Sequence, residues 1–264
     1  MSAYSGHRLR KAIEEKRPAL GLYSKSGSPG LIEVMGYRGL DYVVADLEHS
    51  SVSLEMVEHM VKAAGLSGMS LLVRVPEGES GTVLRVLDGG ANGVVFPHVN
   101  TKQDALSAVS LAKYAPTGKR GWGRTRRGSV EGKDPAIYCR EANEDIIVTA
   151  LIEEMEGVNN IDEILSVQGI SAIDTGPGDL SQSLGVPGNT KAPSVINALE
   201  RIYDACARRG MPVVISASFG ESGIRKYLNR GARLLIELSG DETLFSSALR
   251  DQMTTVKGFL EQTH

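Results

Sequence analysis

The stretch ISAIDTGPGDLSQSLG, residues 170–185, contains the unit from which the fold can be inferred. An apolar run, Ile170–Ile173, leads into the turn-forming Gly-Pro-Gly of residues 176–178 and then into Asp179. A short apolar run that ends in such a turn is typical of a buried strand followed by a helix. The loop itself has two interpretations. It is a turn whose helix is capped by Asp179 or a following serine, or a ligand-binding loop in which backbone N–H groups face an anion and the carboxylate faces a cation.

Short apolar runs of this kind recur along the whole chain, and amphipathic segments with the helical spacing of three and four residues lie between them. We expect strands at Leu20–Tyr23, Tyr42–Ala45, Leu71–Val75, Gly93–Phe96, Ile146–Ile152, Ile170–Ile173, Val213–Ser216 and Leu234–Glu237. We expect helices within residues 53–67, 101–115, 194–210 and 221–232. Alternating strands and helices with nearly continuous apolar strands indicate an α/β protein with a parallel sheet covered on both faces.

The number of units decides between two α/β architectures. Eight strand-helix units in 264 residues predict one domain over residues 1–264, folded as a (β/α)8 TIM barrel. A doubly wound open sheet is the alternative, but no predicted strand is followed by the G-x-G-x-x-G loop of dinucleotide-binding sheets.

Composition excludes several classes of partner. A net charge of −3 leaves no basic surface for nucleic acid or an anionic membrane. Residues 1–20 form a charged amphipathic stretch rather than a signal peptide, and no apolar run is long enough to span a bilayer. The two cysteines, Cys139 and Cys206, lie far apart, as in proteins of a reducing compartment. We therefore expect a cytoplasmic protein with a small-molecule substrate.

Polar residues end most of the predicted strands. In a barrel of this type reactive side chains stand at the carboxyl ends of the strands, so these residues would meet on one rim. They are Ser24 and Ser26, Asp46, Glu48 and His49, Arg74, His98 and Asn100, Glu153 and Glu154, Asp174 and Asp179, Ser216 and Ser218, and Glu237. We expect His98 to be an ordinary hydrogen-bonded loop residue, and Ser216 to contact substrate.

The stretch Asp46-Leu47-Glu48-His49 is the richest part of this rim. A histidine beside carboxylates can act as a general acid or base whose orientation and pKa the carboxylate sets. Solvated charges at a strand end are the equally good alternative.

Three other charged residues have chemical interpretations. Glu153 and Asp179 offer hard oxygen ligands to a divalent cation, although two acids on different loops are a weak signal. Arg74 lies inside the apolar run LLVRV, where an unpaired charge is costly to bury. It therefore needs an anion, a polarised carbonyl or a structural salt bridge.

The segment GWGRTRRG, residues 121–128, lies in the longest predicted loop. Long loops in compact domains are often functional. We favour contact of Arg124, Arg126 and Arg127 with a phosphate or carboxylate over a merely solvated loop. Trp122 is equally consistent with a role as an anchor at a protein interface and with a role in a lid.

Five motifs occur in an order that resembles a known family: DLEHS at 46–50, LLVRV at 71–75, GANGVVFPHVNT at 90–101, LIEEMEG at 151–157 and GPGDLSQSLG at 176–185. They are similar to those of the HpcH/HpaI family of class II, metal-dependent pyruvate aldolases. The resemblance spans nearly the whole chain. It implies a TIM barrel of the phosphoenolpyruvate/pyruvate type, and a lyase that reversibly cleaves a 4-hydroxy-2-keto acid to pyruvate and an aldehyde through a pyruvate enolate. It also implies a homo-oligomer, hexameric in the family.

The resemblance assigns a metal and an acid/base residue. Glu153 and Asp179 would be the protein ligands of Mg2+ or Mn2+, with Co2+ as a further option. His49, oriented by Asp46, would act as acid and base through a water molecule. A carboxylate-paired histidine supplies the base near neutral pH that enolisation of pyruvate requires.

The resemblance also assigns the groups that bind pyruvate. Arg74 would hold the keto oxygen and stabilise the enolate, and the backbone N–H groups of Gly178 and Asp179 would hold the carboxylate. Lys25 is the one lysine at a strand end, so a Schiff-base mechanism is disfavoured.

The sequence departs from the family at a few positions. Leu151 stands where members commonly have Gln, and Asp174-Thr175 stands where the residues are usually apolar. These changes keep a second reaction open, either a citrate-synthase-like condensation with oxaloacetate or a citryl/malyl lyase-like cleavage. A non-catalytic metabolite-binding barrel is a third interpretation, which the joint presence of the predicted site residues disfavours. We expect the N-terminal helix and the C-terminal helix within residues 241–262 to pack in an oligomer.

Overall fold

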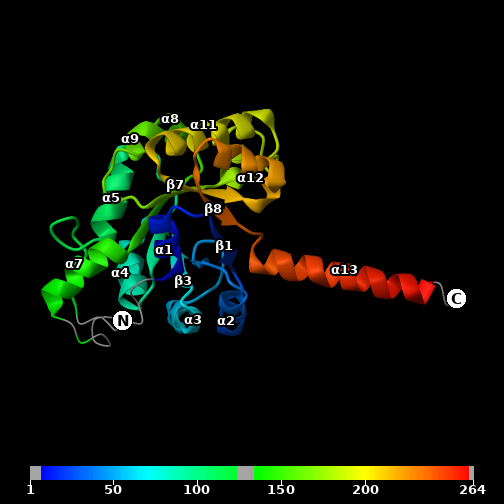
Figure 1. The fold of residues 1–264 in the computed structure, drawn as a ribbon, viewed down its shortest axis with the longest axis horizontal. Helices are drawn as coiled ribbons and strands as arrows, with labels where there is room; N and C mark the ends of the chain where they lie inside the picture. The colour runs from blue at the N-terminus through cyan, green and yellow to red at the C-terminus, as the bar shows by residue number, and fades with distance from the viewer. Residues whose placement is uncertain (1–6, 124–131, 133, 262–264) are drawn as a thin grey trace.

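The computed structural model describes residues 7–123, 132 and 134–261. Eight parallel strands pair in chain order, and the last pairs with the first, so the sheet closes into a barrel (Figure 1). The strands are β1 Ala19–Ser24, β2 Tyr42–Asp46, β3 Ser70–Arg74, β4 Gly93–Phe96, β5 Ile147–Ile152, β6 Ala172–Thr175, β7 Pro212–Ser216 and β8 Arg233–Glu237. The predicted (β/α)8 barrel is confirmed.

Helices alternate with the strands and cover the outside of the barrel (Figure 1). They are α1 Arg8–Glu15, α2 Pro29–Tyr37, α3 Leu54–Ser67, α4 Ser80–Asp88, α5 Lys102–Ala112, α7 Pro135–Asp145, α8 Met155–Asn159, α9 Ile161–Ile164, α10 Pro177–Ser183, α11 Pro193–Arg209, the 3₁₀ helix η1 Ala217–Phe219, α12 Gly220–Asn229 and α13 Asp241–Glu261. Among these described helices, none is both long and apolar enough to cross a membrane.

Local signals in the sequence set where several helices begin and end. The hydroxyl of Ser53 caps α3 by accepting the N–H of Met56. Thr101 and Asp104 form a reciprocal capping box at α5. Such caps satisfy N–H groups that have no partner within the helix. Gly68 ends α3 in the left-handed conformation that glycine adopts without steric cost.

Strand β6 both begins and ends two residues later than the apolar run Ile170–Ile173 predicts, so that Asp174 and Thr175 lie inside the strand. Gly169, with φ of 102°, turns the chain just before it. The polar pair is tolerated because both side chains are hydrogen-bonded within the barrel. Tyr23 donates to Asp174, and the Thr175 hydroxyl donates to the carbonyl of Val214. Polar residues with internal partners can therefore continue a buried strand.

Helix α1 closes the base of the barrel. Its Leu9 and Ala12 are fully buried and join the apolar cluster inside the barrel. Its start is fixed by Ser70, whose hydroxyl oxygen bonds the His7 ring and accepts the N–H of Leu9. The apolar face of α1 is thus used within the chain, and its predicted role in an oligomer stays a prediction.

Positively charged side chains gather at the base of the barrel. The helices end there because they run antiparallel to the strands. The Lys113 ammonium donates to the carbonyls of Asn143 and Ile146 at the end of α7, at 2.6 Å each. Arg233 donates to the carbonyls of Ile13, near the end of α1, and Gly210, just after α11. Cationic groups are favourable at helix C-termini, whose last carbonyls lack helical partners. The cations at the base therefore have a structural role.

Helix α13 projects away from the barrel (Figure 1). It is anchored through Asp241, whose carboxylate accepts hydrogen bonds from the hydroxyls of Ser24 and Ser26 and from the N–H of Lys25. Burial by itself raises the pKa of Asp241, but the bonds from these serines outweigh burial and lower the pKa. The anchor places the start of α13 beside the carboxyl end of β1.

A close approach between β4 and β5 requires a glycine, which gives a test of the barrel geometry. A Cβ at Gly93 would lie 2.3 Å from the backbone oxygen of Ile147. We expect Gly93→Ala to lower the free energy of unfolding by about 2 kcal/mol or more, because the backbone must move. Gly65→Ala, in helix α3 with open space around it, is the matched control and should stabilise by up to about 1 kcal/mol. Urea denaturation followed by far-UV circular dichroism checks both, and equal midpoints would contradict this packing.

Candidate active site

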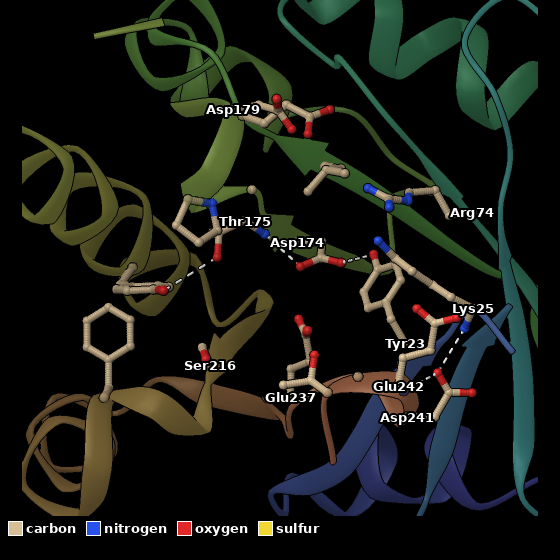
Figure 2. Close-up of a pocket in the computed structure, with 18 residues that line it drawn as sticks. Tyr23, Lys25, Arg74, Asp174, Thr175, Asp179, Ser216, Glu237, Asp241 and Glu242 are labelled. Carbon is tan, nitrogen blue, oxygen red and sulfur yellow. Dashed lines mark hydrogen bonds between the residues drawn. The ribbon is translucent and has the colours of Figure 1, made fainter. Parts of the chain in front are cut away.

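A cavity of 370 Å³ opens at the carboxyl ends of the strands. Its walls come from β1, β3, β5, β6, β7 and β8, the start of α10 and the start of α13 (Figure 2). The predicted rim residues that line it are Arg74, Glu153, Asp174, Asp179, Ser216 and Glu237. Six of the predicted rim positions thus meet at one pocket.

The Arg74 side chain enters this pocket as half of a buried ion pair. Arg74 and Asp46 are neighbours in the β2–β3 register. The Arg74 Nε and Nη2 groups donate to the two Asp46 oxygens at 3.0 and 2.7 Å, which is the bidentate geometry of a guanidinium and a carboxylate. Burial by itself raises the pKa of Asp46, but hydrogen bonds from Arg74 lower it. Burial by itself lowers the pKa of Arg74, but Asp46 raises it.

The motif after β2 is organised by the same carboxylate. Asp46 Oδ1 accepts the backbone N–H groups of Glu48 and His49 at 3.1 Å each. The His49 imidazole itself lies 3.9 Å from Glu48 Oε2, and 54% of the side chain is exposed. Asp46 therefore fixes the backbone of His49. The same carboxylate also accepts hydrogen bonds from the Arg74 guanidinium. The acid/base role of His49 stays a prediction.

Glu48 and Lys25 add to this charged cluster. Glu48 Oε2 lies 3.3 Å from Arg74 Nη1, and Lys25 Nζ lies 3.8 Å from Asp46 Oδ2. Lys25 lines the pocket, as its strand-end position suggests. Both described cations of the pocket are thus close to carboxylates of the β2 motif.

Glu153 follows β5 and is only 2% exposed. Its Oε1 accepts the backbone N–H of His98 at 2.9 Å, and His98 Nδ1 bonds Glu154 at 2.9 Å. His98 is the hydrogen-bonded loop residue that the sequence suggests. Among the hydrogen bonds of the described residues, none reaches Glu153 Oε2. Burial, assisted by the charges of Asp179 and Glu48, raises the pKa of Glu153 to about 7.

The loop after β6 leads directly into α10. A Cβ at Gly176 would lie 2.6 Å from Glu153 Cβ, so the missing side chain makes room for Glu153. Helix α10 begins at Pro177, and Asp179 lies in its first turn and is exposed. Asp179 is therefore not the helix cap that the simpler interpretation of the loop required. In the described chain, the N–H groups of Gly178 and Asp179 donate to no carbonyl, as expected for a first turn.

The floor of the pocket adds Tyr23, which the sequence did not place on the rim, to the predicted polar residues Asp174 and Ser216. Tyr23 donates to Asp174 Oδ2 at 2.7 Å, and its ring lies under the Arg74 guanidinium at 5.0 Å (Figure 2). Leu151 is the register neighbour of Asp174 and also lines the pocket. Ser216 is paired with Ser218 through their hydroxyls at 2.8 Å. The inward position of Tyr23 could have been predicted, because alternate residues of a strand point into the barrel. Its hydrogen bond to Asp174 on β6 could not.

Two carboxylates of the cavity, Glu153 and Asp179, offer oxygen atoms of the type that hard divalent cations prefer. Glu153 lines the cavity, and its Oε2, which accepts no hydrogen bond from the described residues, is available to a cation there. The residues present therefore fit such an ion. No group of three or more His, Cys, Asp or Glu side chains within the described ranges could hold a metal ion, so substrate and water would complete the ligand shell.

Arg124, Arg126 and Arg127 lie outside the described residues, so their predicted contact with an anion stays a prediction. Trp122 is described and is 58% exposed.

Comparison with known proteins shows which family model and which proteins the chain is similar to. The model of the HpcH/HpaI aldolase/citrate lyase family matches residues 19–248. The 5-keto-4-deoxy-D-glucarate aldolase of Escherichia coli O6:H1 strain CFT073 is 32% identical over 251 residues, which cover 95% of this chain and 97% of that protein. The HpcH/HpaI aldolase from Desulfitobacterium hafniense DCB-2 is 31% identical, with a TM-score of 0.87 over 96% of this chain and 97% of that chain. Citrate synthase SbnG is 29% identical, with a TM-score of 0.87 over 96% and 99%.

The buried ion pair yields a stability prediction. Asp46→Ala leaves the Arg74 guanidinium unpaired in a buried position, and we expect a loss of about 3–5 kcal/mol in the free energy of unfolding. The matched control is Asp204→Ala, which breaks a surface pair with Arg230 whose side chains are 45% and 44% exposed; we expect a loss of less than about 1 kcal/mol there. Urea denaturation measures both, and similar losses for the two variants would contradict the structural importance of the buried pair.

Glu237 yields a pH prediction. Burial, assisted by the charge of Asp174, raises the pKa of Glu237 from 4.5 to about 8, although Arg74 lowers it. The folded chain therefore binds this proton more tightly than the unfolded chain. The resulting stabilisation is complete below about pH 4.5 and is lost as the pH rises through about 8. Glu237→Gln should remove this loss, so the melting temperature of the variant relative to the parent should rise between pH 5 and pH 8. A constant difference across this range would contradict the shift.

Proposed function

The chain belongs to the HpcH/HpaI aldolase/citrate lyase family, and from that membership we propose that it is a divalent-metal-dependent aldolase that reversibly cleaves a 4-hydroxy-2-keto acid to pyruvate and an aldehyde. Family membership makes it a carbon–carbon lyase with a small-molecule substrate. The observation that carries the finer proposal is the meeting of Arg74, Glu153 and the first turn of α10 at one cavity. We also propose a cytoplasmic location, which the free thiols of Cys139 and Cys206 support.

The proposed binding of the keto acid uses donors at and beside the pocket, whose lining includes Pro177 and Asp179 at the start of α10. The N–H groups of Gly178 and Asp179 at the start of α10 suit a carboxylate, because a helix N-terminus favours negative charge. Arg74 has five N–H groups and uses one each of Nε and Nη2 on Asp46. Nη1 also faces Glu48 at 3.3 Å, so the second N–H of Nη2 and one N–H of Nη1 remain to donate to the keto oxygen.

The reaction requires that negative charge on the keto oxygen be stabilised. Proton removal from the 4-hydroxyl breaks the C3–C4 bond, releases the aldehyde and leaves the electron pair in the enolate of pyruvate, which is then protonated at C3. Arg74 is held in place by Asp46 before the charge develops, as electrostatic catalysis requires. A divalent cation held by Glu153 and Asp179 would supply additional charge stabilisation. His49 remains our proposed acid/base residue, acting through water because its side chain is exposed.

A second candidate is condensation of an enolate with oxaloacetate. The observation that favours it is the similarity to Citrate synthase SbnG at a TM-score of 0.87. Formation of a condensation product from oxaloacetate, without cleavage of 4-hydroxy-2-keto acids, would support this candidate instead.

The direct test of the aldolase proposal is exchange of the pyruvate methyl protons in heavy water, followed by NMR. We expect exchange with added Mg2+ or Mn2+ and none after metal removal. Glu153→Gln should slow exchange by about 100-fold or more, because a group that stabilises the enolate charge is lost. Glu156→Gln, an exposed acid on the neighbouring helix α8, is the matched control and should exchange like the parent. Absence of exchange with every metal would remove the pyruvate aldolase proposal.

The exposed apolar stripe of α13 supports the proposed homo-oligomer. Phe245, Leu249, Met253, Val256 and Leu260 are between 45% and 70% exposed and recur at helical spacing. A stripe of this kind on a projecting helix is an expected site of association. The sequence resemblance suggests a hexamer.

We therefore expect the parent protein to elute as an oligomer in size-exclusion chromatography with light scattering. Phe245→Glu combined with Val256→Glu should reduce the assembly, because both charges would be buried at an interface. Thr254→Glu combined with Ser247→Glu, on the opposite face of α13, is the control and should leave the mass unchanged. A monomeric parent protein would contradict the proposed assembly.

A further inference from the structure

The floor of the pocket is polar on the side formed by β1, β6 and β8 (Figure 2). Asp174 is 2% exposed. Its Oδ2 accepts the Tyr23 hydroxyl and its Oδ1 accepts the N–H of Thr175, each at 2.7 Å. The carboxylate of Asp174 is therefore fixed in orientation while it remains on the cavity wall. A fixed acceptor at the wall of a cavity is suited to recognise a donor on a ligand.

Glu237 lies on the adjoining part of the wall. It is the register neighbour of Ser216 on β7 and of Gly21 on β1, and it lines the same cavity. Among the described residues, no hydrogen bond or ion pair engages its carboxyl group. Glu237 is half-buried and lines the cavity, so its carboxyl group is available to a ligand that can form a hydrogen bond with it. The raised pKa of Glu237, about 8, indicates that the group carries a proton at neutral pH and can donate it in a hydrogen bond.

The cations of the pocket neutralise this floor only in part. Burial raises the pKa of Asp174 and Glu237, and the charge of Arg74 lowers both without an ion pair to either. Arg74 is held by Asp46 and Glu48, and Lys25 lies 3.8 Å from Asp46. A further carboxylate at the floor would meet Asp174 without a cation of its own, which like-charge repulsion disfavours. A hydroxyl group can donate to Asp174 and accept from protonated Glu237. A methyl group would leave the Glu237 carboxyl group without a partner and would use none of the remaining acceptor capacity of Asp174.

We propose that Asp174 and Glu237 form a hydroxyl-binding subsite at the floor of the pocket, so that the part of the substrate that reaches it bears a hydroxyl group and no carboxylate. This inference rests on the proposed aldolase function and specifies its substrate class, a 2-keto acid with a hydroxylated, uncharged group at this point. The hydroxyl belongs either to the donor keto acid or to the acceptor aldehyde. The subsite disfavours oxaloacetate as the molecule that fills it.

The experiment compares matched pairs on both sides of the reaction. For the acceptor, kcat/KM with pyruvate is measured for glycolaldehyde, propionaldehyde and glyoxylate. For the donor, proton exchange at C3 is measured for 3-hydroxypyruvate and 2-oxobutyrate. In at least one pair we expect the hydroxylated compound to be favoured by about 10-fold or more over its methyl analogue, because the analogue leaves polar groups unpaired. The side that shows the preference identifies the source of the hydroxyl.

Variants connect the preference to the two acids. Asp174→Leu and Glu237→Leu should bring the ratio of hydroxylated to methyl compound close to one. Asp174→Asn and Glu237→Gln keep hydrogen-bonding groups, so they should retain much of the preference and accept glyoxylate better than the parent. Glu242→Gln changes an exposed acid at the mouth of the same pocket and should leave the ratios unchanged. Circular dichroism confirms that each variant is folded.

Calorimetric binding of 3-hydroxypyruvate and 2-oxobutyrate gives a readout that does not need turnover. Tighter binding of the hydroxylated acid that is lost in the leucine variants supports the subsite. The subsite is overturned if 3-hydroxypyruvate and 2-oxobutyrate bind equally tightly and glycolaldehyde and propionaldehyde react equally fast. This holds even when pyruvate methyl exchange is intact and the aldolase proposal stands. If the parent shows neither turnover nor methyl exchange, the aldolase proposal fails, and equal affinities alone then overturn the subsite.

Discussion

The bidentate pair of Arg74 and Asp46 is the interaction on which the arrangement of the pocket depends. Its two members leave neighbouring strands at the same register position, so the closed barrel itself brings them together. Asp46 is fully buried and Arg74 is 8% exposed, and neither charge could be placed there without the other. The pair also fixes its surroundings, because Asp46 holds the backbone of the β2 motif and the ring of Tyr23 packs under the guanidinium.

The two ends of the barrel use charge in opposite ways. At the base, Lys113 and Arg233 donate to carbonyls where helices end, and their role is structural. At the pocket, carboxylates outnumber cations, and burial raises the pKa of Glu153 to about 7 and that of Glu237 to about 8. Unneutralised buried acids destabilise a fold, so their presence is best explained by ligands that bind them. In our account a divalent cation binds Glu153, and a hydroxyl group binds Glu237.

Most of the fold could be predicted from the sequence because buried parallel strands appear as short apolar runs, each followed by a turn and a helix. The boundary of β6 could not, since Asp174 and Thr175 look like loop residues until their partners on other strands are known. The gathering of Arg74, Glu153 and Asp179 followed from the rule that strand ends share a rim. The anchoring of α13 by Asp241 to Ser24 did not, because this contact joins residues 217 positions apart. The exposed position of the His49 ring was equally hidden, since the sequence does not show that Asp46 bonds Arg74 and the backbone of its own motif.

We propose that Glu153 and Asp179 hold a divalent cation close to a bound keto acid. Paramagnetic relaxation of 13C-labelled pyruvate by Mn2+ tests it most directly, because the effect depends on the distance between the ion and each carbon. Our account predicts strong relaxation of the carboxylate and keto carbons in the parent protein, lost in Glu153→Gln and in Asp179→Asn. Mn2+ that binds without relaxing pyruvate, or relaxation that both variants retain, would contradict it.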